Sequence, residues 1–182
     1  MSRQKRCFKK NGIYHITQRS VKGCFAFKEP YDKAMLLKLM DRMRMKHPFE
    51  LLYYVVMDNH VHFLIRVTEG DLSVAIGQIN RLYACYYNRE YGREGVLFDK
   101  RFSDAQIYGT SHLMTAIEYI ANNPVKAGIV REAADYRWSG HNEVLANQIC
   151  YIDRSALLRS IDVDENRAMK IYLRRISPVR LS

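Results

Sequence analysis

The chain has 182 residues, of which 48% are hydrophobic, and its 29 Lys and Arg exceed its 19 Asp and Glu to give a formal net charge of +10. This composition suits one folded domain with a real core and argues against a disordered chain. No apolar run approaches the roughly 20 residues that span a bilayer, and the basic N-terminus leads into no signal-peptide segment. The four cysteines form no Cys-x-x-Cys pair. We therefore expect a cytoplasmic, nucleoid-associated protein without a membrane partner, whose positive charge favours nucleic acid.

The N-terminal third predicts a strand and then a helix. Residues 12–19 form the strand pattern, and residues 24–27 either extend this strand or pair with it. Pro30 suits the first turn of a helix, and the apolar residues that follow recur with helical spacing as far as His47-Pro48.

A β-hairpin is the clearest element of the sequence. Residues 49–57 and 60–67 are two apolar runs rich in β-branched and aromatic residues, and Asp58-Asn59 separates them. Side chains two apart on a strand point to the same face, so His60 and His62 lie side by side. Two imidazoles so placed can hold a divalent metal or a phosphate, although ordinary structural histidines remain an alternative and two ligands do not close a metal site.

The second half predicts further helices around one short extended segment. Asp71 suits the N-cap of a long helix that fades by Tyr91-Gly92, and residues 96–107 predict a strand or arm with a basic centre. Another helix is expected over 111–122, before Pro124. The order β-α-β-β-α-β with an added helix indicates an α+β fold of the ferredoxin-like or RRM-like plan, an antiparallel sheet with helices on one face.

The added helix carries a second pair of polar residues. Tyr119 and Asn123 are four positions apart and therefore share a helical face. Because Pro124 disfavours helical geometry at the preceding residue, Asn123 is expected at the helix end, where its amide oxygen can face a metal. Tyrosine and asparagine are also common near helix ends, so this spacing alone does not assign them a function.

Five segments together resemble one family. Residues 57–63 (Met-Asp-Asn-His-Val-His-Phe) and 119–128 (Tyr-Ile-Ala-Asn-Asn-Pro-Val-Lys-Ala-Gly) are similar to motifs of the single-tyrosine transposases of the HUH nuclease superfamily, and most of all to the REP-associated tyrosine transposases. Residues 13–17, 96–102 and 138–139 extend the similarity, which covers the chain from about residue 10 to about residue 145. The resemblance implies a transposase-like domain over residues 1–145, followed by a partly helical tail, 146–182, without an assignment.

The resemblance implies a specific chemistry. Tyr119 matches the nucleophile, His60 and His62 match the His-hydrophobe-His metal motif, and Asn123 matches the polar third ligand. Such an enzyme nicks and rejoins single-stranded DNA through a 5′-phosphotyrosine, and nitrogen and oxygen ligands of this kind suit Mg²⁺ or Mn²⁺. We expect a transposase that recognises single-stranded or hairpin DNA, takes part in DNA transposition or in processing repeat elements, and exists as a monomer or homodimer. The candidate phosphate contacts are Arg66, Lys100, Arg101 and Lys126.

Three alternatives remain open. A non-catalytic single-stranded nucleic-acid module on the same fold would make the histidines structural, although no RNP-like run of aromatics is present. A two-histidine phosphoesterase is suggested by His15-Ile16-Thr17, but that class needs two such motifs. A zinc hydrolase would need a motif such as His-Glu-x-x-His, which the sequence lacks.

Overall fold

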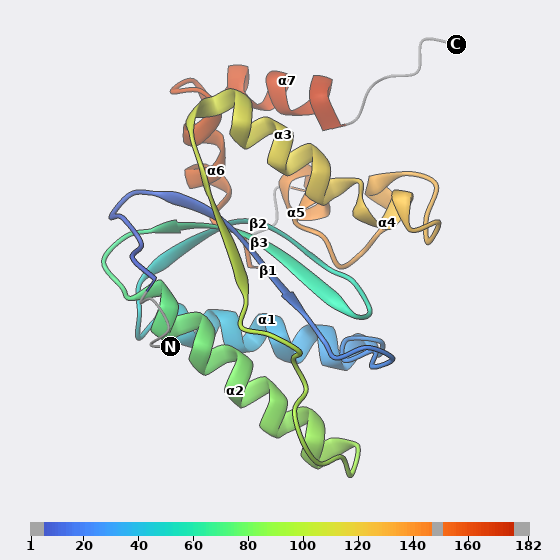
Figure 1. Ribbon diagram of the computed structural model, residues 1–182. Helices are drawn as coiled ribbons and strands as arrows, with labels where there is room; N and C mark the ends of the chain where they lie inside the picture. The colour runs from blue at the N-terminus through green and yellow to red at the C-terminus, as the bar shows by residue number, and fades with distance from the viewer. Residues whose placement is uncertain (1–5, 147–150, 177–182) are drawn as a thin grey trace.

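A computed structural model, which describes residues 6–146 and 151–176, contains a four-stranded sheet with helices against both faces (Figure 1). The elements in chain order are β1 (Ile13–Arg19), α1 (Pro30–Arg44), β2 (Phe49–Val56), β3 (His60–Val67), α2 (Leu72–Glu90), β4 (Ser103–Ile107), α3 (Gly109–Ala121), α4 (Asn123–Lys126), the 3-10 turn η1 (Ala133–Asp135), α5 (Gly140–Ala146), α6 (Arg154–Ile161) and α7 (Glu165–Ile176). The strand order is β2-β3-β1-β4, and every neighbouring pair is antiparallel. The predicted fold class is thus confirmed.

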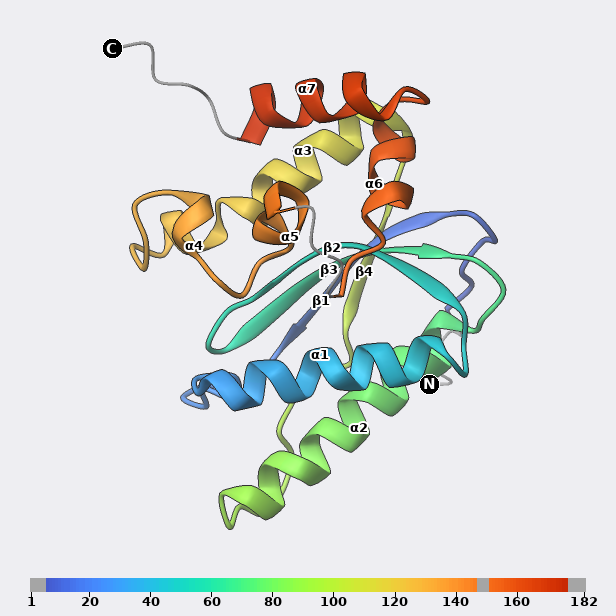
Figure 2. The same ribbon diagram turned by 180° about the vertical axis from the view of Figure 1, so that it is seen from behind.

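The helices α1 and α2 lie side by side on one face of the sheet (Figures 1 and 2). Pro30 is at the start of α1, where its missing N–H costs no hydrogen bond. The side chain of Asp71 caps α2 by accepting hydrogen bonds from the backbone N–H groups of Ser73 (2.9 Å) and Val74 (3.2 Å). Both predicted helix starts are confirmed.

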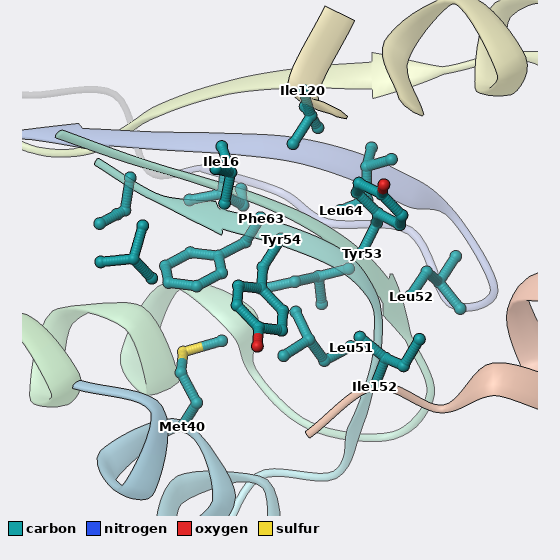
Figure 3. Close-up of a cluster of buried hydrophobic side chains, with 14 of the residues drawn as sticks. Ile16, Met40, Leu51, Leu52, Tyr53, Tyr54, Phe63, Leu64, Ile120 and Ile152 are labelled. Atoms are coloured by element: carbon teal, nitrogen blue, oxygen red, sulfur yellow. The ribbon is translucent and has the colours of Figure 1, made fainter. Parts of the chain in front are cut away.

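The second face of the sheet is covered by α3, α5 and α6, with α7 packed on α3, so β2 and β3 are largely buried on both sides (Figure 2). Figure 3 shows the two halves of the core: Met40 of α1 lies on the side of Phe63, and Ile120 of α3 lies on the side of Tyr53 and Leu64. All five side chains are buried. Ile120, the residue after Tyr119, therefore anchors α3 to the sheet.

The tail beyond residue 146 is part of this packing. Its helices α6 and α7 bury apolar residues against β2 and α3, and the buried hydroxyl of Tyr172 lies 3.1 Å from that of Tyr53. Arg175 of α7 donates a hydrogen bond to Glu118 of α3 at 2.5 Å. The helix α7 therefore packs on the side of α3 that faces away from the sheet, and α6 lies beside α3 (Figure 2).

Three predicted elements need correction. Residues 24–27 form no strand; the segment is a turn, with a positive φ of 80° at Gly23, and the backbone N–H of Phe27 bonds the carbonyl of Asp58 in the hairpin turn. Of residues 96–107 only 103–107 form a strand, and the helix expected over 111–122 is α3, over 109–121. A hydrogen bond to the hairpin turn fixes the first of these segments and pairing with β1 fixes the second, and neither contact leaves a local pattern in the sequence.

Candidate active site

Two adjacent strands present polar side chains to the face that α3 covers. In the antiparallel register of β1 and β3, Thr17 is opposite His62 and Arg19 is opposite His60. Residues opposite one another share a face, and so do residues two apart on each strand, which adds His15. The sheet thus places these five side chains together at one end of β1 and β3.

Tyr119 projects over these histidines from α3. Its ring centroid lies 5.6 Å from that of His62 and 6.1 Å from that of His15, in both cases edge to face. The imidazoles of His60 and His62 are 5.1 Å apart between centroids. The tyrosine side chain is 45% exposed, so its hydroxyl can meet a partner from solution.

Asn123 closes the arrangement at the first residue of α4. Its side-chain N–H donates to the backbone carbonyl of Tyr119 at 2.8 Å, which leaves the amide oxygen for another partner. That side chain also lies close enough to His60 to influence the pKa of its imidazole. The two predicted pairs, His60 with His62 and Tyr119 with Asn123, are therefore brought together as the sequence indicated.

An open pocket of about 540 Å³ contains all of these groups. Its lining includes two cations, Arg19 and Lys126, and no carboxylate. Neither cation forms an ion pair within residues 6–146 and 151–176, and the Lys126 ammonium lies 5.2 Å from the Tyr119 ring centroid. A pocket of this charge suits an anion such as a DNA phosphate.

The histidines of the pocket are held in their neutral form. Burial lowers the pKa of His15 below its usual value, and burial together with the charge of Arg19 lowers the pKa of His60, against a smaller upward effect of the Asn123 hydrogen bond. Burial, with the charges of His15, His60 and Arg19, lowers the pKa of His62 to about 3. Since a neutral imidazole keeps one lone pair at neutral pH, these rings remain available as ligands.

The donor set fits a divalent cation. The Nδ1 atom of His60 lies 2.7 Å from the Oδ1 atom of Asn59, and Nδ1 of His62 lies 2.8 Å from Nε2 of His15, so Nε2 is the nitrogen of each ring that a ligand could take. With the amide oxygen of Asn123 these nitrogens make a mixed N and O set of the kind that Mn²⁺, or less readily Mg²⁺, accepts. In the part of the chain that the structure describes, no group of three His, Cys, Asp or Glu side chains offers a competing metal site.

The four predicted DNA contacts are spread over the molecule. Lys126 lines the pocket, whereas Lys100 and Arg101 are exposed on the segment between α2 and β4. Arg66 lies at the other end of β3, where it is ion paired with Glu50 at 2.8 Å. The structure therefore brings one of the four to the tyrosine and gives Arg66 a structural partner.

Three polar residues of β1 line the pocket without having been predicted as part of it, namely His15, Thr17 and Arg19. The first two stood in the sequence only as part of the family-like segment 13–17 and of the phosphoesterase alternative. Their alternation on one strand was a usable signal. The register that sets them against the histidine pair joins strands about 45 residues apart, and local sequence does not encode it.

The sequence profile of the IS200-like transposases matches residues 9–123, which is well over half of the chain. The chain belongs to this family. Membership assigns it to the DNA-binding enzymes of DNA transposition and recombination and confirms the resemblance found in the sequence.

Relatives and solved structures agree with this family. A Haemophilus influenzae protein of the REP-associated tyrosine transposase type is 26% identical over 171 residues, which cover 80% of this chain and 89% of the relative. The REP-associated tyrosine transposase of Escherichia coli is 27% identical over 123 residues, 65% of this chain and 70% of the relative. A REP-associated tyrosine transposase solved with a bound REP hairpin has the same fold, with a TM-score of 0.67 at 23% identity over 84% of this chain and 90% of that one.

The described residues include no helix with the length and apolar character needed to cross a bilayer.

Proposed function

We propose that this transposase nicks and rejoins single-stranded DNA, with Tyr119 as the nucleophile and a divalent metal held by His60, His62 and Asn123. The observation that carries the proposal is the single pocket in which the tyrosine faces the histidine pair beside two unpaired cations and no carboxylate. All of these residues come from one chain, so one copy holds the complete set. A metal bound there would neutralise charge on the scissile phosphate and hold it in line for attack.

The cleavage step exchanges one phosphodiester for another. The Tyr119 hydroxyl oxygen attacks the phosphorus, the bond from phosphorus to the 3′-oxygen breaks, and the leaving oxygen takes up a proton to become a free 3′-hydroxyl. The product is a 5′-phosphotyrosine. Attack on it by the 3′-hydroxyl of another strand reverses the step and restores the tyrosine, so strand transfer needs no ATP.

The chain's own residues supply binding and charge for this step. Arg19 and Lys126, which both line the pocket, would hold phosphate oxygens near Tyr119. The Lys126 ammonium above the ring also stabilises the negative charge that builds on the phenol oxygen as its proton leaves. Lys100 and Arg101 would contact phosphates of the DNA strand outside the pocket.

The DNA substrate is inferred to be a hairpin with a single-stranded extension. A tyrosine that stands over a sheet reaches a backbone phosphate most easily in a flexible strand. The neighbour of the same fold was solved with a REP hairpin, which supports a folded DNA element as the recognition unit. The half-exposed tyrosine leaves room for such a strand to enter.

The test is adduct formation with a labelled hairpin that carries a single-stranded extension, in Mn²⁺ or Mg²⁺. We expect a covalent protein–DNA species that survives denaturation, disappears when EDTA is added first, and maps to residues 117–126. The released fragment should carry a 3′-hydroxyl that a terminal transferase extends. Tyr108, exposed at the other end of α3, is the internal control: an adduct there, or cleavage without an adduct, would contradict the proposal and favour chance reactivity or a metal-dependent hydrolase.

A further inference from the structure

Each histidine of the pair has its Nδ1 atom occupied. The partner of His60 is Oδ1 of Asn59 at 2.7 Å, and the partner of His62 is Nε2 of His15 at 2.8 Å, with Oγ1 of Thr17 at 3.2 Å. A neutral imidazole has one N–H and one lone pair. The group bonded to one ring nitrogen therefore decides what the other nitrogen can do.

The tautomers of His60 and His62 depend on different kinds of hydrogen-bond partner. The amide oxygen of Asn59 can only accept, so Nδ1 of His60 carries the hydrogen and Nε2 carries the lone pair. The partner of His62 is itself an imidazole nitrogen, which can donate or accept. At 2.8 Å two lone pairs repel and two N–H groups collide, so one of the rings must donate.

Only one of the two arrangements leaves His62 able to bind a metal. If His15 donates from Nε2, Nδ1 of His62 accepts and its Nε2 carries a hydrogen, which blocks that nitrogen as a ligand. If His15 instead carries its hydrogen on Nδ1, its Nε2 accepts from His62, and Nε2 of His62 keeps its lone pair. The Thr17 hydroxyl lies at the same nitrogen and can accept from it in the second arrangement.

We propose that His15 is a positioning residue whose Nε2 accepts the Nδ1 hydrogen of His62 and so keeps Nε2 of His62 open for a divalent metal. The proposal rests on the proposed function, because it presupposes that His60 and His62 hold the ion. His15 itself needs no contact with the ion, since its Nε2 is engaged by His62. The same bond fixes the plane of the His62 ring beneath Tyr119.

The first test needs no variant. Long-range ¹⁵N–¹H NMR correlations in the metal-free wild-type protein at neutral pH identify the tautomer of each imidazole. We expect hydrogen on Nδ1 of both His15 and His62. Hydrogen on Nε2 of His62 would overturn the proposal.

The second test compares two variants at position 15. His15→Gln supplies an amide oxygen that can accept from His62, and His15→Phe fills similar space without an acceptor. Removing a group that orients a ligand typically weakens metal binding by about 10 to 100-fold, which is the loss of Mn²⁺ affinity we expect for His15→Phe by EPR titration. His15→Gln should stay close to the wild type and keep the His62 tautomer. Equal Mn²⁺ affinity in all three proteins would refute the positioning role of His15. If His15→Phe does not fold, the affinity of His15→Gln and the His62 tautomer of the wild type still test that role.

Failure of this proposal can be told apart from failure of the proposed function. If His62→Ala binds Mn²⁺ as tightly as the wild type, the metal assignment itself is wrong. If His62→Ala loses Mn²⁺ while His15→Phe retains it, the metal assignment stands and only the role of His15 is overturned.

Discussion

Removal of the hydroxyl oxygen should have opposite effects at Tyr119 and at Tyr136 on stability and on activity. The Tyr119 hydroxyl has no hydrogen-bond partner within residues 6–146 and 151–176, and its ring is half exposed, so Tyr119→Phe should change stability by less than about 0.5 kcal/mol. The buried Tyr136 hydroxyl donates to the carbonyl of Val56 at 2.7 Å. Tyr136→Phe leaves that carbonyl without this donor and should cost about 2 kcal/mol.

These free energies convert into melting temperatures. In a domain of this size 1 kcal/mol corresponds to roughly 2–4 °C, so Tyr136→Phe should melt about 4–8 °C below the wild type and Tyr119→Phe within about 2 °C of it. Calorimetry gives the melting temperatures, and the denaturing-gel assay for the DNA adduct is run at a temperature where both variants are folded.

The expected pattern separates folding from chemistry. Tyr119→Phe should form no adduct while it binds the hairpin as well as the wild type, and Tyr136→Phe should still form one. Adduct formation by Tyr119→Phe would refute the assignment of the nucleophile. A large loss of stability in that variant would refute the structural part of the reasoning.

Three further outcomes follow from the site and the core. His60→Ala and His62→Ala should each lose Mn²⁺-dependent cleavage while circular dichroism stays native, and a wild-type cleavage rate in either would contradict the ligand assignment. Hairpin binding followed by fluorescence anisotropy should weaken with salt, with a log–log slope of about −0.7 for each single-strand phosphate contacted, and a flat response would argue against the cationic pocket as a phosphate site. Burial lowers the pKa of His141 to about 4 from its ordinary 6.5, so the unfolded chain binds this proton more readily than the folded one. Stability should therefore fall between about pH 6.5 and pH 4, by up to about 3 kcal/mol from this group, and urea titrations of His141→Asn should show a shallower fall, whereas an unchanged slope would contradict this.

The elements with a strong local pattern were predictable. The hairpin around Asp58-Asn59, the helix after Pro30 and the helix capped by Asp71 each combine periodicity with a boundary residue, and the structure has all three. The helices of the tail gave a weaker signal. In α7 the buried Ala168, Tyr172 and Ile176 recur only every fourth residue, so the stripe is too narrow to reveal what it packs against.

The site was predictable in its motifs and unpredictable in its surroundings. His60 and His62 share a face of one strand, and Asn123 follows Tyr119 by about one helical turn where α3 gives way to α4, and both relations can be read from spacing. His15 and Arg19 reach the pocket only through the pairing of β1 with β3. That pairing depends on the whole sheet, so the sequence of each strand taken alone could not predict that His15 lies against His62.

The salt bridge between Arg175 and Glu118 connects α7 to the residue before Tyr119. The family match ends at residue 123, yet α3, the helix that carries Tyr119, is sandwiched between the sheet and a segment some 50 positions later. A chain cut at residue 123 would therefore keep Tyr119, the histidine pair and Asn123 but lose the helix that packs behind Tyr119. The structural unit that holds Tyr119 extends to α7, and the match to the family profile understates its length.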